Sequence, residues 1–134
     1  MRALLLPVGP DVYAIDMVAA REVVAAPVVQ ALPTAPRSVL GVFNLRGDIV
    51  PLFDTALLLG VGNDGGGDVP FVGVVETPFG PAGLAMSGIG SSVELGEPVG
   101  ATETPGTLAT YVLDDRLVVL IDLEALLAPS RIEV

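Results

Sequence analysis

The feature that most restricts the fold of this chain is the short length of its apolar runs. Apolar residues make up 51% of the 134 residues, yet 16 glycines and 12 prolines divide them into runs of a few residues each. Aromatic residues are only 4% and Trp is absent, so the apolar content is mainly Val, Leu and Ala. Valine favours strands, whereas Gly and Pro favour turns. The sequence therefore predicts an all-β fold of short strands rather than long helices.

Turn residues between apolar runs predict a series of hairpins. Gly9-Pro10-Asp11, Arg46-Gly47, Thr77-Pro78-Phe79-Gly80 and Asp114-Asp115 each separate two such runs. We expect the main strands over residues 3–8, 12–16, 22–26, 39–44, 48–53, 69–76, 81–86, 108–113 and 116–121, with weaker ones over 92–95 and 99–102. The segment 60–68, which is rich in Gly, Asn and Asp, lacks the lysine of a phosphate loop and the spacing of a calcium loop, and a surface loop is the expectation.

The two halves of the chain repeat one pattern. Residues 47–54 and 115–122 each contain a turn, an apolar strand and a final aspartate, and Leu-rich helical turns follow. Asp54 and Asp122 are predicted helix N-caps, because a carboxylate accepts the free N–H groups of a first turn. Each half is too small to bury an adequate core alone. We therefore expect one domain over 1–134, with two barrel-like subdomains at roughly 12–68 and 69–121 that share a core, and terminal segments crossing between them.

Charge and residue types exclude several classes of function. The formal net charge is −10, which disfavours binding to nucleic acid or to anionic lipid. The chain has no Cys, His or Lys, so thiol, imidazole and lysine chemistry and Cys/His metal sites are impossible. We expect no cofactor and no metal. Pro and Gly interrupt every uncharged stretch that might serve as a signal peptide or a membrane span, and a cytoplasmic location is the expectation.

Two motifs admit a second interpretation. Arg46-Gly47-Asp48 spells the integrin-recognition tripeptide, although a hairpin turn with Gly47 at positive φ explains it with fewer assumptions. Phe53-Asp54-Thr55-Ala56 resembles the active-site strand of aspartic proteases, and Asp122 lies at the repeated position, so an aspartate-dyad hydrolase is the enzymatic alternative. Ala56 replaces the glycine that normally follows Asp-Thr, which favours the N-cap interpretation.

Glu22 and Arg46 are the charged residues that deserve a pairing hypothesis. Val23 and Val24 follow the glutamate, and Leu45 precedes the arginine. Charged side chains among apolar neighbours usually pair when they are partly buried. An ion pair and two unrelated solvated side chains remain equally good interpretations from the residues alone.

The first half of the chain also carries a more specific pattern, formed by residues 12–16, 21–23, 32–36, 39–47 and 50–54. In order, spacing and residue type these segments resemble the CheW family of bacterial chemotaxis coupling proteins. The resemblance extends over nearly the whole chain, although the second half matches mainly in its apolar pattern, through 111–115 and 116–127. It implies two intertwined, five-stranded SH3-like barrels and a function without catalysis.

The resemblance also implies partners and a binding site. Family members hold a CheA-type histidine kinase to the cytoplasmic tip of a chemoreceptor, and the receptor tip is implied to lie in a groove between the barrels. On this sequence the implied groove residues are Ala20, Val23, Gly41, Val42 and Asn44, with the Glu22–Arg46 ion pair beside them. The kinase regulatory domain is itself CheW-like and is implied to pack barrel to barrel through apolar strand surfaces.

A divergent CheW-like scaffold, in a pilus-type or non-chemotaxis system, is the alternative within the family. Ala20 is smaller than the apolar residue usual at its position. Thr55-Ala56 replaces a common Leu-Arg, and residues 86–92 lack the acidic and valine residues often found between the barrels.

Overall fold

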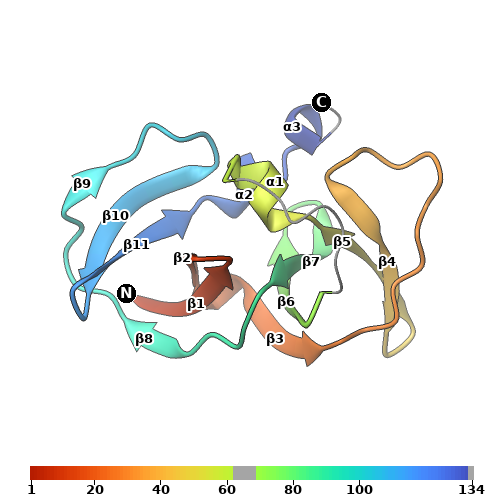
Figure 1. The fold of residues 1–134 in the computed structure, drawn as a ribbon, viewed down its shortest axis with the longest axis horizontal. Coiled ribbons are helices and arrows are strands. Elements are labelled where there is room, and N and C mark those ends of the chain that lie inside the picture. The colour runs from red at the N-terminus through yellow and green to blue at the C-terminus, as the bar shows by residue number, and fades with distance from the viewer. Residues whose placement is uncertain (62–68, 133–134) are drawn as a thin grey trace.

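The computed structural model describes residues 1–61 and 69–132, and its strands form two sheets. The first sheet has the order β8-β1-β2-β11-β10-β9, and the second has the order β3-β6-β7-β5-β4. The sheets lie side by side along the long axis of the molecule (Figure 1). The strands are β1 (Arg2–Val8), β2 (Asp11–Asp16), β3 (Ala20–Ala25), β4 (Val39–Leu45), β5 (Asp48–Phe53), β6 (Phe71–Thr77), β7 (Gly80–Met86), β8 (Ser92–Glu94), β9 (Gly100–Ala101), β10 (Thr107–Leu113) and β11 (Arg116–Ile121).

The mainly β fold is confirmed, with one strand more than expected in the first sheet, because both β8 and the short β9 join it. Residues 62–68 of the predicted Gly-rich loop lie outside the described residues. The helices are the 3-10 turn η1 (Met17–Ala19) and the α-helices α1 (Thr55–Leu59), α2 (Leu123–Leu126) and α3 (Pro129–Ile132). Within the described part of the chain, none of them is long and apolar enough to cross a lipid bilayer.

Each sheet exchanges a hairpin with the other half of the chain. The β1–β2 hairpin pairs with β8 and β11, and the β6–β7 hairpin pairs with β3 and β5. The sheets therefore do not divide the chain at the predicted boundaries of 12–68 and 69–121. The first sheet combines residues 2–16 with 92–121, and the second combines 20–53 with 71–86. The local pattern of turn and apolar residues predicts a hairpin, but it does not predict which distant strand pairs with the free edge of that hairpin.

Among the described residues, three apolar clusters fill this architecture. One lies inside the first sheet and includes Tyr111 and Leu120, and one lies inside the second and includes Phe43 and Leu52. The largest contains residues of both sheets, such as Ile15. This third cluster is the shared core that the small size of each half predicts.

Candidate functional site

The Glu22–Arg46 ion pair joins the two outer strands of the five-stranded sheet. Glu22 lies on β3, Arg46 lies in the turn after β4, and these strands are at opposite ends of the order β3-β6-β7-β5-β4. Arg46 Nη2 donates to Glu22 Oε1 at 2.5 Å. Because the two strands are not hydrogen-bonded neighbours, the sheet must curl for the two side chains to meet. We call this junction between β3 and the β4–β5 turn the seam.

Glu22 lies at the edge of the core of its own sheet. It shares a face of β3 with Val24, which packs against the cluster containing Phe43. The Glu22 side chain is 27% exposed, whereas that of Arg46 is 67% exposed. The Glu22 side chain is therefore mostly enclosed by the protein, whereas the Arg46 side chain is mostly in contact with solvent.

The backbone of the β4–β5 turn aims Arg46 at the seam. Arg46 and Gly47 have φ values of 49° and 93°, so both central residues are left-handed, as a tight hairpin with this twist requires. The side chain of Asn44 accepts a hydrogen bond from Gly47 N at 2.9 Å. Asn44, which is exposed, therefore has a structural role in this turn.

The five implied groove residues all lie on the two strands of the seam, but in different surroundings. Ala20 and Val23 on β3 are half-buried and pack against the core between the sheets. Gly41 on β4 is buried beneath Val29 and Gln30, where an added Cβ would lie 2.4 Å from Gln30 O.

Val42 is half-buried and exchanges two backbone hydrogen bonds with Gln30, of 2.8 and 2.9 Å. The segment around Gln30 thus covers β4 at two of the implied groove residues, Gly41 and Val42. The close approach at Gly41 gives that glycine a packing role that needs no ligand.

Asp54 and Asp122 each serve their own helix. Asp54 Oδ1 accepts from Leu57 N and Asp122 Oδ1 accepts from Ala125 N, both at 3.2 Å. One follows β5 in the second sheet and the other follows β11 in the first sheet. This arrangement supports the N-cap interpretation over the aspartate dyad.

Equivalent turns of the two halves expose apolar side chains. Ile49 at the start of β5 is 63% exposed, and Leu117 at the start of β11 is 65% exposed. On the first sheet, Val112 on β10 pairs with Leu117 and is exposed, and Leu108, at the bulge near the start of β10, is exposed as well. We call Leu108, Val112 and Leu117 the β10–β11 patch. It is an apolar strand surface on the outside of the molecule.

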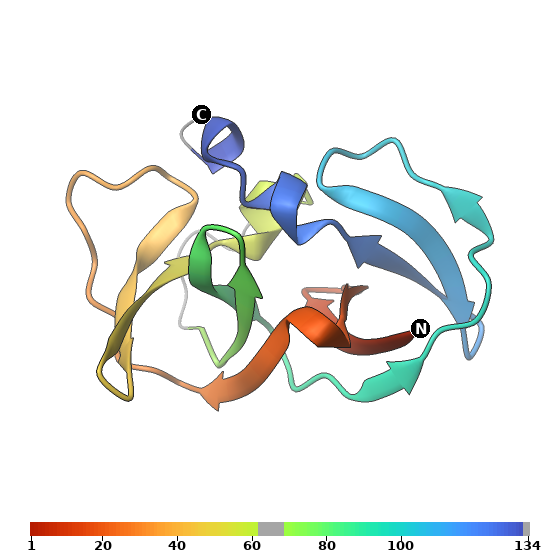
Figure 2. The ribbon, with the colours of Figure 1, turned by 180° about the vertical axis from the view of Figure 1, so that it is seen from behind.

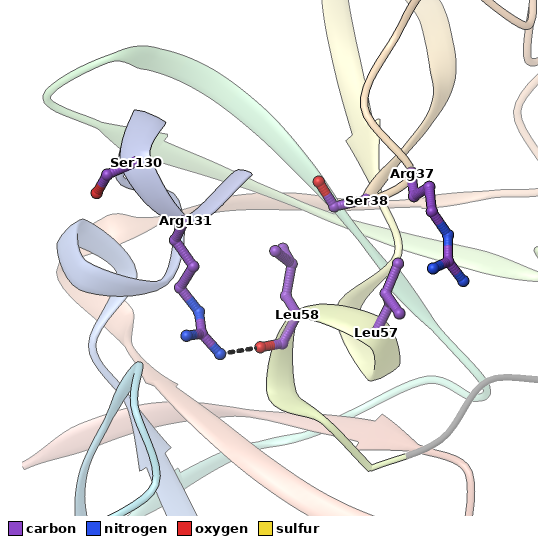
Figure 3. A pocket seen from close by; sticks show the side chains of 6 residues that line it. All are labelled: Arg37, Ser38, Leu57, Leu58, Ser130 and Arg131. Carbon is purple, nitrogen blue, oxygen red and sulfur yellow. Dashed lines mark hydrogen bonds between the residues drawn. The ribbon is translucent and has the colours of Figure 1, made fainter. Parts of the chain in front are cut away.

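Sequence reasoning did not identify a pocket beside α3. Arg37, Ser38, Leu57, Leu58, Ser130 and Arg131 line it, and its volume is about 460 Å³ (Figure 3). Ser38 Oγ donates to Ile132 O at 3.1 Å, and Arg131 Nη2 donates to Leu58 O. These contacts connect residues up to 94 positions apart, which no local sequence signal could have indicated.

Comparison with known proteins agrees with this architecture. The sequence model of the CheW-like domain family matches residues 2–130 of this chain, and this range includes both sheets and the seam. The chain belongs to the CheW-like domain family. A curated CheW-like relative is the chemotaxis protein CheW of Treponema pallidum (strain Nichols), 39% identical over 46 residues. That alignment covers 34% of this chain and 27% of the relative. The matched segment is therefore only about a quarter of the length of that protein.

A solved CheW structure has the same fold. The crystal structure of the scaffolding protein TtCheW from Thermoanaerobacter tengcongensis superposes with a TM-score of 0.83. The match covers 99% of this chain and 96% of that chain, at 22% sequence identity. The order of strands and the exchanged hairpins thus belong to a CheW-like fold that has been observed experimentally.

Proposed function

We propose that this CheW-like protein is a chemotaxis adaptor that couples a chemoreceptor to a CheA-type histidine kinase through protein–protein binding. It acts in the cytoplasm, at the cytoplasmic tip of the receptor, and catalyses no reaction. The match of the CheW-like model to residues 2–130 is the observation that carries this proposal.

The receptor contact is assigned to the seam. The Glu22–Arg46 pair holds the β4–β5 turn against β3, and Ala20 and Val23 lie next to it on that strand. A helical receptor tip would gain affinity from apolar contacts along β3, and a seam that is already closed would lower the entropic cost of binding. In this proposal Arg46 positions the surface, and its contribution is preorganisation.

The kinase contact is assigned to exposed strand surfaces. The β10–β11 patch and Ile49 present branched apolar side chains to solvent on hydrogen-bonded strands. Such surfaces suit a second barrel that packs face to face, because two pleated faces can exclude water without a deep pocket. The two assignments use different parts of the molecule and can be tested separately.

Co-sedimentation tests the receptor assignment. The purified protein is mixed with receptor-containing membranes and a CheA-type kinase, and the bound fraction is compared for wild type, Arg46→Ala and Arg2→Ala. Arg2→Ala is the matched control, because Arg2 also forms an exposed pair, with Glu94 at 3.9 Å, away from the seam. We expect weaker receptor binding for Arg46→Ala only, while circular dichroism shows that all three proteins are folded.

Equal sedimentation of Arg46→Ala and wild type would show that Arg46 does not contribute to the receptor site.

Capture from the native cytoplasm on the immobilised protein tests the proposal as a whole. Recovery of a histidine kinase together with a chemoreceptor supports it. Recovery of the kinase without a receptor indicates a scaffold that lacks receptor binding, and recovery of neither contradicts the adaptor function.

A further inference from the structure

The short helix α3 connects the two sheets of the molecule. It follows β11 of the first sheet through α2, and it contacts residues next to β4 and β5 of the second sheet. Both views of the ribbon show α3 above the junction between the sheets (Figures 1 and 2). Ser38 and Ile132, which are 94 positions apart in the sequence, meet here. We call residues 128–132 the clasp.

Among the described residues, two hydrogen bonds and an apolar contact dock the clasp on the second half of the fold. Ser38 Oγ donates to Ile132 O at 3.1 Å, and Arg131 Nη2 donates to Leu58 O on α1 (Figure 3). The Ile132 side chain is half-buried against the core between the sheets. A guanidinium near the C-terminal end of a helix is favourable, because the carbonyls there carry partial negative charge. Ser38 O also accepts from Asp54 N at 2.8 Å, so the clasp contacts the segment that holds the start of α1.

The docking of the clasp is shallow. None of the four residues of α3 is buried. A pocket of about 460 Å³ lies beside the helix, lined by Ser130 and Arg131 of the clasp and by Leu57 of α1, among others (Figure 3). Water fills a polar space of this size in solution, so water can replace the hydrogen bonds of the clasp as they open. Segments with few buried apolar contacts and solvent-accessible hydrogen bonds are those that open locally.

The helical turn of α3 depends on this docking. The turn begins at Pro129, and the N–H groups of Arg131 and Ile132 both donate to Ala128 O, at 2.9 and 3.1 Å. A single isolated turn is unstable in water, because it fixes several backbone dihedrals for very few hydrogen bonds. Loss of the contacts to Ser38 and α1 should therefore unwind the turn at the same time, and the clasp should open as one unit.

We propose that the clasp is a conformational switch that detaches from Ser38 and α1 as a unit while both sheets stay folded. Detachment leaves the sheets joined by their shared core and by the chain segments that cross between them, so each sheet gains freedom to move relative to the other. A partner that contacts both sheets would favour one of the two states and shift the equilibrium between them. The inference concerns the unbound protein and therefore does not depend on the proposed adaptor function.

Native-state hydrogen exchange in increasing urea tests the switch. Amide exchange of full-length ¹⁵N-labelled protein is followed by NMR at Arg131 and Ile132, and at Val50 and Val118 in the buried parts of β5 and β11. Docking should slow exchange of the two clasp amides by about tenfold to a hundredfold relative to an unstructured chain. The strand amides should be at least about a hundredfold better protected than that. Clasp exchange should not depend on urea, because local opening exposes little surface, whereas strand exchange should accelerate with urea.

Two serine variants show which contact breaks on opening. Ser38→Ala removes a hydrogen bond of the clasp and should accelerate exchange at Arg131 and Ile132 about fivefold. Ser87→Ala is the matched control, because Ser87 Oγ accepts from Gly9 N at 3.0 Å in the loop between β7 and β8, outside the clasp. It should leave the clasp rates unchanged, even where it lowers the urea midpoint. Arg131→Gln removes the guanidinium and should act in the same direction as Ser38→Ala.

Four results would overturn the proposal. Urea-dependent exchange at Arg131 and Ile132 that follows the strand amides would show that the clasp opens only when the whole protein unfolds. Exchange at the rate of an unstructured chain would show that the clasp is not docked. Equal acceleration of the clasp amides by Ser38→Ala and Ser87→Ala would mean that opening does not break the Ser38 contact. Unchanged clasp exchange in Arg131→Gln would contradict the role of the contact to α1.

Discussion

Substitution of Gly41 by alanine should destabilise the fold, because the added methyl group would clash with the protein itself and not with a bound partner. The new Cβ would lie 2.4 Å from Gln30 O and 2.8 Å from Val29 Cγ1. The first of these contacts is to backbone, which a rotamer change cannot relieve. The segment around Gln30 must therefore move away from β4.

The size of the effect follows from the contacts that this movement breaks. Gln30 and Val42 exchange two backbone hydrogen bonds, of 2.8 and 2.9 Å. At about 1 kcal/mol each, their loss costs about 2 kcal/mol. Overpacking of the remaining structure typically adds about 1–3 kcal/mol. We expect Gly41→Ala to lower the free energy of unfolding by about 3–5 kcal/mol.

Urea denaturation followed by circular dichroism measures this change, with Gly96→Ala as the matched control. Nothing lies within 4 Å of a Cβ built at Gly96, so that variant should differ from wild type by less than about 0.5 kcal/mol. A loss below about 1 kcal/mol for Gly41→Ala would refute the packing argument. Reduced receptor binding in a Gly41→Ala protein of normal stability would instead identify Gly41 as a contact residue.

Three further predictions follow from single contacts. A double-mutant cycle of Glu22→Gln and Arg46→Gln should give a coupling of about 0.5 kcal/mol that disappears in concentrated salt, because the arginine is 67% exposed; a coupling above about 2 kcal/mol would mean that the pair is far better shielded than its exposure indicates. Asp54→Ala and Asp122→Ala should each cost about 1 kcal/mol of unfolding free energy in urea through loss of an N-cap, and wild-type stability would argue against capping. Burial raises the pKa of Tyr13 above 10.0, so the native state keeps a phenol proton that the unfolded chain loses. This stabilisation is present below pH 10.0 and is lost as the pH rises through the native pKa, so Tyr13→Phe should unfold with a flatter pH dependence above pH 10.0; equal slopes would exclude Tyr13 as the source.

Local signals in the sequence account for the elements. The turn at Arg46-Gly47 and the strand over 48–53 are found where the alternation of apolar and turn residues predicts them. Asp54 and Asp122 cap helices because their carboxylates lie within three residues of the N–H groups that they accept. Such features depend on contacts within a few residues, so they can be read from one segment at a time.

Partner choice between distant segments was decided only by the tertiary structure. The sequence shows that two halves repeat, but not that each hairpin pairs with the other half, because a free strand edge offers the same backbone groups to any partner. The closed seam, the cover of Gln30 over Gly41 and the pocket beside α3 all depend on that choice. By itself the sequence determined a mainly β chain of two repeated halves with a family pattern in the first. Long-range packing, which must satisfy both sheets and the shared core together, decided which surfaces those residues form.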